Sequence, residues 1–170
     1  MTTFVALLRA VNVGGTGKLP MTELKSMCEG AGFTAVRTYI ASGNVVFDSG
    51  QGEAKVKAAL EAALLAYAGK PVQVLVRSGA ELARVLAANP FKKTAPNRTV
   101  AIFLDEAPPA DALEHVSGRK DEEIALGTRE IFVHYGEGMG QSKLKIRAAV
   151  EGTARNLNTV AKLAAMAAGS

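Results

Sequence analysis

Apolar residues occupy consecutive positions near the start of the chain, from Phe4 to Leu8. A strand with one face in water would alternate apolar and polar residues, so this run predicts a central strand covered on both faces. Three glycines between residues 14 and 17 then interrupt regular structure, and Pro20 suits the first turn of a helix. The apolar side of that helix consists of Met21, Leu24, Cys28 and Ala31.

A β-hairpin is predicted next, because two β-rich runs at 36–41 and 45–47 flank the sequence Ser42-Gly43-Asn44. Glycine and asparagine tolerate the positive φ that a tight hairpin turn requires. A helix over 53–68 and a strand over 71–77 follow. The first 77 residues therefore have the element order of a ferredoxin-like βαββαβ unit.

The rest of the chain predicts a second lobe of related architecture, without a repeat at the level of residues. Its expected elements are a helix at 80–88, a strand at 99–104, a short helix near 110–116, strands at 123–126 and 130–135, a helix from Ser142, and a final helix over 153–166 with Thr153 as N-cap. The predicted fold class is α+β and two-lobed. A ferredoxin-like lobe at 1–77 is followed by a second α+β lobe at 78–170 packed on the first, and the two could count as one compact domain.

The composition of the chain indicates a globular protein with its own core and favours a location in the cytoplasm. With 170 residues, 48% of them apolar, the chain can bury a core without a disulfide or a metal. The single cysteine and the lack of a signal-peptide pattern favour a cytoplasmic protein. The longest apolar runs, at 4–8 and 163–168, are far shorter than a membrane span.

Charge is unevenly distributed along the chain. Residues 105–137 contain nine Asp or Glu and three Lys or Arg, a net charge of −6. Because the whole chain has a net charge of +4, the remaining residues together carry +10. If the fold separates these segments, one face would attract phosphate or nucleic acid. Mixed surface charge that merely keeps the protein soluble explains the same numbers.

The loop at 12–18 lies between the first predicted strand and helix, where backbone N–H groups and a helix N-terminus can hold an anion. It matches neither nucleotide-binding pattern, because the Walker motif needs glycine at Asn12 and Ser or Thr at Leu19, and the dinucleotide motif needs glycine at Pro20. A turn that only reverses the chain remains the alternative. Arg9 at the end of the strand favours anion binding, since burying an unpaired arginine is costly.

The predicted last helix carries one polar stripe, formed by Arg155, Asn158, Thr159 and Lys162. Such a stripe is typical of a solvated helix face. Alternatively, Thr153, Arg155 and Asn156 at the helix N-terminus would together bind a phosphate or a carboxylate.

Catalytic and metal-binding patterns are weak. Ser142 and Lys145 match the serine–lysine spacing of penicillin-recognising enzymes, but the accompanying motifs are missing. Cys28 lies on the apolar side of its helix, which predicts a core residue and no nucleophile. His115 and His134 have no partners at metal-ligand spacing, so neither a metal nor a cofactor is expected.

Five segments of the chain resemble one known family, in the same order. They are 5–15, 37–47, Asn89-Pro90-Phe91, 140–144 and 153–159. On these segments the chain is similar to a largely bacterial domain-of-unknown-function family, number 1697. The resemblance implies a two-lobed α+β fold with a ferredoxin-like N-terminal part, and it implies no activity. Members often carry glycine where Ala10 stands and an aromatic residue where Leu157 stands.

The expected site combines polar residues from the ends of several elements. It consists of Arg9, Asn12, Gly14, Gly15 and Lys18, of Ser42 and Asn44 at the hairpin, and of Arg155 and Asn156 at the last helix. We expect these residues to converge on a cleft between the lobes that binds a small anionic molecule, with catalysis undecided. Single-stranded nucleic-acid binding through a basic groove and a protein-interaction module are the alternatives, and no membrane partner is expected.

Overall fold

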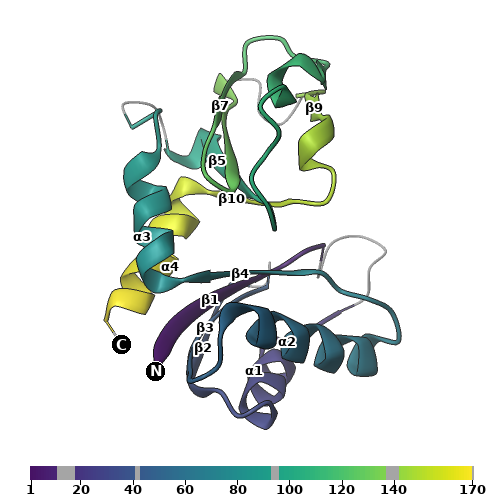
Figure 1. Ribbon diagram of the computed structural model, residues 1–170, viewed down its shortest axis with the longest axis vertical. Coiled ribbons are helices and arrows are strands. Elements are labelled where there is room, and N and C mark those ends of the chain that lie inside the picture. The colour runs from purple at the N-terminus through teal and green to yellow at the C-terminus, as the bar shows by residue number, and fades with distance from the viewer. Residues whose placement is uncertain (11–17, 41–42, 93–95, 137–141, 170) are drawn as a thin grey trace. The chain divides into compact units, whose positions relative to one another are not determined.

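The computed structural model of the protein describes residues 1–10, 18–40, 43–92, 96–136 and 142–169 (Figure 1). By its contacts the chain divides into two units. The first unit consists of Met1–Ala83 and Lys162–Ser170, and the second consists of Arg84–Ala161. The structure is a mixed α and β fold with four α-helices and antiparallel sheets in its described part.

The first unit contains a four-stranded antiparallel sheet and two helices. Its elements are β1 (Thr2–Leu8), α1 (Met21–Gly30), β2 (Thr34–Tyr39), β3 (Asn44–Ser49), α2 (Glu53–Ala68) and β4 (Val74–Ser78). The strand order is β2-β3-β1-β4, so β1 is an inner strand, as its apolar run predicts. The hairpin predicted around residues 42–44 is confirmed by the antiparallel pairing of β2 and β3.

Helices α1 and α2 cover one face of this sheet, and the main core lies between them (Figure 1). Phe4, Ala6 and Leu8 of β1 point into this core. Val5 and Leu7 are buried too, which confirms that β1 is covered on both faces. Within the core the rings of Phe33 and Phe47 stack with centroids 4.3 Å apart.

The second unit contains another four-stranded antiparallel sheet, in the order β10-β5-β8-β7, and a two-stranded ribbon of β6 and β9. The strands are β5 (Thr99–Phe103), β6 (Val116–Ser117), β7 (Glu123–Leu126), β8 (Glu130–His134), β9 (Lys145–Ile146) and β10 (Thr153–Asn156). Helices α3 (Gly79–Ala88) and α4 (Leu157–Ala168) each contain a point at which the chain passes from one unit to the other. Short 3-10 helices are η1 (Pro96–Arg98), η2 (Ala112–Glu114) and η4 (Arg147–Ala149).

The prediction of a helix from Ser142 is wrong. The segment instead contributes β9 and η4, because Ile146 is buried and pairs with Val116 of β6. The observed division differs from the predicted lobes, 1–77 and 78–170, since the first part of α3 and the last part of α4 belong to the first unit. None of the helices in the described segments has the length and hydrophobicity of a membrane span.

The last helix begins four residues later than predicted, and Thr153 is not its N-cap. Residues 153–156 pair with β5 as a strand, with Thr153 opposite Phe103 and Arg155 opposite Ala101. The helix N-cap is Asn156, whose Oδ1 accepts a hydrogen bond of 2.9 Å from the backbone N–H of Thr159. Arg155 therefore does not belong to a polar stripe on the helix.

Candidate functional site

Each of the four strands of the first unit has one terminus at the same end of the sheet. Leu7 of β1 pairs with Asn44 of β3, Tyr39 of β2 pairs with the same Asn44, and Leu8 pairs with Val74 of β4. The segments that follow β1 and β2 and the segments that precede β3 and β4 therefore lie together. We call this part of the molecule, formed by residues 9–10, 18–20, 40, 43 and 69–73, the cationic end.

Backbone hydrogen bonds fix Arg9 in the middle of the cationic end. The N–H of Leu8 donates to the carbonyl of Gly43 at 2.9 Å, and the N–H of Arg9 donates to the carbonyl of Gln73 at 2.9 Å. Asn44 is fully buried beside them, and its Nδ2 donates to the carbonyl of Tyr39 at 2.9 Å. Asn44 thereby holds the two arms of the hairpin at the end of β1.

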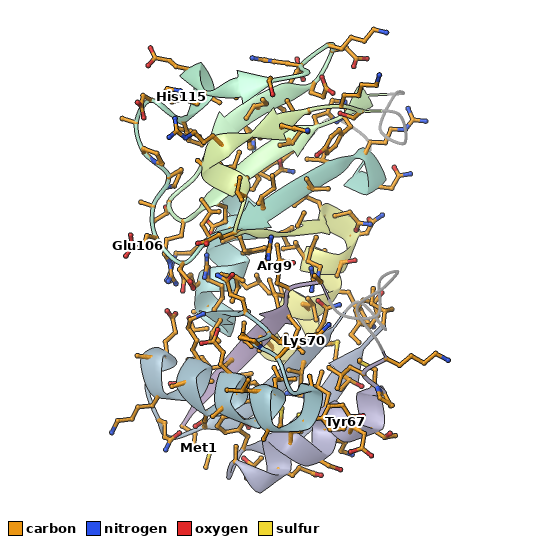
Figure 2. The ribbon with its side chains drawn as sticks, turned by 90° about the vertical axis from the view of Figure 1, so that its right-hand side faces the viewer. Met1, Arg9, Tyr67, Lys70, Glu106 and His115 are labelled. Atoms are coloured by element: carbon orange, nitrogen blue, oxygen red, sulfur yellow. The ribbon has the colours of Figure 1, made fainter. Side chains whose placement is uncertain are left out.

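The segments that form the cationic end are basic in sequence. The connecting segments 9–20, 40–43 and 69–73 contain Arg9, Lys18 and Lys70 and no Asp or Glu. Figure 2 looks onto this side of the first unit and shows Arg9 and Lys70 there. Helix α1 begins just after Lys18 and adds the positive end of its dipole, although Glu23 in its first turn offsets part of it.

Two strained residues flank the same place. Ala10 has φ 56° and Ile40 has φ 52°, a left-handed conformation that is uncommon for alanine and rare for a β-branched residue. In the described segments the third such residue is Ala35, which lies at the register shift in β2. Strain of this kind costs roughly 1–3 kcal/mol per residue and concentrates at ligand sites.

A shallow apolar groove adjoins the cationic end. It has a volume of about 310 Å³ and is lined by Glu61, Ala62, Leu65, Pro71, Val72 and Gln73. Gln73 connects the two features, since its carbonyl accepts the hydrogen bond from Arg9. Glu61 is the acidic residue of the groove, and its carboxylate accepts hydrogen bonds from Lys57 Nζ at 3.1 Å and from the N–H of Val74 at 3.0 Å.

Arg155 of the second unit is a buried cation in β10. Its Nη1 donates to Thr153 Oγ1 at 2.8 Å and to the carbonyl of Ala154 at 3.0 Å. Burial lowers the pKa of the Arg155 guanidinium from 12.5 to about 10, which leaves it charged at neutral pH.

A protein-family model matches residues 1–132, and its family is described as a protein of unknown function, DUF1697. The chain belongs to this family. A solved structure of a conserved bacterial protein from Streptococcus pneumoniae superposes with a TM-score of 0.82 over 98% of each chain, at 26% sequence identity. No curated protein matches the sequence. Membership of DUF1697 confirms the resemblance and assigns no activity.

The predicted site residues of this DUF1697 protein fall into three groups. Arg9 and Lys18 belong to the cationic end, and Asn44 adjoins it as the first residue of β3. Arg155 and Asn156 belong to the second unit, where Arg155 contacts Thr153 and Asn156 caps α4. The predictions on Asn12, Gly14, Gly15 and Ser42 fall outside the described residues.

Lys70 is a residue of the cationic end that the sequence analysis missed. The signal was present in Gly69-Lys70-Pro71, a helix-ending glycine and a cation directly before a strand. Using it requires the strand register, because only the pairing of Leu8 with Val74 brings this segment to the end of β1.

The nucleophile candidates have structural roles. Ser142 Oγ donates to the carboxylate of Glu122 and accepts a hydrogen bond of 3.2 Å from the N–H of Leu144, so its partner is a carboxylate and not Lys145. The Ser142 hydroxyl is the main cause that lowers the pKa of Glu122. Burial raises the pKa of the Cys28 thiol to about 12, as expected of a core residue. The described residues contain no group of three His, Cys, Asp or Glu side chains able to hold a metal.

Proposed function

We propose that the protein binds a small anionic molecule, with a phosphate or carboxylate group, at the cationic end of the first unit. The observation that carries the proposal is the placement of Arg9, Lys18 and Lys70 on segments that adjoin strand or helix ends at one end of the sheet and whose sequence contains no acidic residue. A charge-assisted hydrogen bond to such a group is about twice as strong as a neutral one. The strained backbone at Ala10 and Ile40 supports the same location.

The groove beside Gln73 suggests where the uncharged part of the ligand lies. Ala62, Leu65, Pro71 and Val72 give it apolar walls, and the carboxylate of Glu61 is already hydrogen-bonded. A ligand with an acidic group at Arg9 and a compact apolar body in this groove would use both features.

The assignment of each unit to a known type of fold is also a proposal. We infer that the first unit is ferredoxin-like and that the second is a related α+β lobe. The βαββαβ element order and the strand order β2-β3-β1-β4 support the first assignment. The antiparallel sheet β10-β5-β8-β7 supports the second.

Thermal unfolding in the presence of candidate ligands tests the proposal. The panel contains nucleotides, sugar phosphates, carboxylic acids and short single-stranded oligonucleotides, each at low and high salt. A ligand at about 100 times its Kd adds roughly 2.7 kcal/mol to the free energy of unfolding, a rise in Tm of about 5–10 °C at this chain length. A rise with one small anion that persists at high salt supports the proposed site.

The matched variants are Lys18→Ala at the cationic end and Lys55→Ala at the opposite end of the sheet of the first unit. Both lysines are exposed, and Lys55 lies in the first turn of α2, which follows the far end of β3. Lys18→Ala should reduce the rise in Tm, and Lys55→Ala should leave it unchanged. Equal effects of the two variants, or a rise with oligonucleotides alone that disappears at high salt, contradict the proposal.

A further inference from the structure

The β6–β9 ribbon of the second unit has one face in the core and one face in solvent. Its register pairs Val116 with Ile146 and Ser117 with Lys145. The N–H of Arg147 donates to the carbonyl of His115 at 3.1 Å, which extends the pairing by one residue. Because directly opposed residues share a face and successive residues alternate, the ribbon sorts these side chains into two sets.

Val116 and Ile146 form the inner set, since both pack in the apolar core of the second unit. The outer set therefore consists of two opposed pairs. The first pair is His115 and Arg147, and the second, two residues away along each strand, is Ser117 and Lys145. Three nitrogen-bearing side chains and one hydroxyl are thus gathered on one face. Figure 2 shows His115 at the surface of this unit.

Residues of this outer face take part in two adjoining cavities, and Val116 and Ile146 of the inner set also line the smaller one. His115 and Arg147 take part in both, one of about 430 Å³ and the other of about 360 Å³. Ser117 and Lys145 line the smaller one. Pro109, Ala112 and Ala148 give the larger one apolar walls.

Two acidic residues face the same cavities. Asp111 Oδ2 lies 3.3 Å from His115 Nε2, a contact that holds the orientation of the imidazole ring. Glu114 lines the smaller cavity. Lys145 and Arg147 line the same cavities and balance the charges of these two acids.

We propose that the outer face of the β6–β9 ribbon binds a phosphate monoester. Arg147, Lys145 and His115 donate to the phosphoryl oxygens, and the compact organic group lies against the apolar walls of the larger cavity. The site lies in the second unit and is independent of the proposed function at the cationic end. A free phosphate and a phosphoryl group on a larger molecule share this chemistry, so the test separates them.

Proton NMR of the imidazole groups provides a direct readout, because the chain has two histidines. His134 serves as internal reference, since its Nδ1 lies 3.0 Å from Thr99 Oγ1 on a different part of the same unit. Sulfate and phenyl phosphate are titrated separately.

The expected result is a saturable shift of the His115 signals with both probes and no comparable shift at His134. Phenyl phosphate binds more tightly than sulfate, because its ring packs against the apolar walls of the larger cavity. Arg147→Ala and Lys145→Ala each weaken binding about tenfold. Lys120→Ala, an exposed lysine outside the ribbon, leaves it unchanged.

Unchanged His134 signals in each variant show that the unit is still folded. The proposal is overturned if His115 does not respond, if both histidines shift alike, or if neither Arg147→Ala nor Lys145→Ala weakens binding. Equal affinity for sulfate and phenyl phosphate overturns the assignment to an ester and identifies a site for free anions.

Discussion

At the scale of single residues, the backbone of Ala10 is the clearest conflict between sequence and conformation. Its φ of 56° is one that glycine adopts freely and alanine does not, and its side chain is exposed. Alanine retains the strain beside Arg9.

Ala10→Gly should raise the free energy of unfolding. Relief of the left-handed conformation is worth roughly 1–2 kcal/mol, and the greater freedom of glycine in the unfolded chain offsets about 0.4–1 kcal/mol of that. The matched control is Ala62→Gly, an exposed position inside α2, where the same substitution should cost about 1 kcal/mol. Urea unfolding measures both, and effects of the same sign would show that Ala10 is not strained.

Cys28 provides a second prediction at this scale. Its pKa is 9.0 in an ordinary environment and about 12 in the folded protein. Below pH 9 the thiol is neutral in both states, whereas between pH 9 and pH 12 the unfolded chain loses a proton that the folded chain keeps. The free energy of unfolding therefore falls as the pH rises through this range.

Urea unfolding at pH 8 and pH 10 checks this sign. The wild type should lose about 1 kcal/mol more than Cys28→Ala between the two pH values. The variant removes the thiol and leaves the other titrating groups in place, so equal losses in both proteins would show that burial does not perturb the thiol.

At the scale of elements, α4 depends on a side chain that was predicted for ligand binding. Asn156 Oδ1 caps the helix through the N–H of Thr159. Asn156→Ala should lower the free energy of unfolding by about 1 kcal/mol, and Asn156→Asp should retain most of the stability, because its carboxylate accepts the same hydrogen bond. Chemical denaturation measures both, and an Asn156→Ala protein as stable as the wild type would contradict the capping role.

The elements that sequence alone predicts are those decided locally. The apolar run of β1 and the turn residues before β3 require no knowledge of distant partners. The segment at 153–156 is different, because its strand state depends on pairing with β5, about 50 residues earlier in the chain. The ribbon strand β9 likewise requires β6, so the local pattern after Ser142 favoured a helix.

The candidate site follows the same rule. Arg9, Lys18 and Asn44 stand near the glycine-containing sequences at 14–17 and 42–43, which local patterns reveal. Lys70 joins them only through the register of β1 with β4, and His115 meets Arg147 only through the register of β6 with β9. Residues brought together by non-local strand pairing are those that the sequence could not place.

At the scale of the whole molecule, the distribution of charge along the chain is more informative about ligand binding than the net charge of +4. The cationic end of the first unit contains Arg9, Lys18 and Lys70 on segments without acidic residues, whereas the 105–137 segment of the second unit is strongly acidic. If the ligand binds at the cationic end, its affinity should fall as the salt concentration rises, because salt screens the charges of Arg9, Lys18 and Lys70. The fall should be less steep than for a nucleic-acid strand, which contacts more cations.

The most direct test of the central claim is an amide NMR titration of the full chain with the small anion that gives the largest rise in Tm. We expect saturable shifts at residues 8–10, 43–44 and 69–73, which Lys18→Ala weakens and Lys55→Ala does not. Shifts confined to other parts of the chain, or equal in the two variants, would contradict a ligand site at the cationic end.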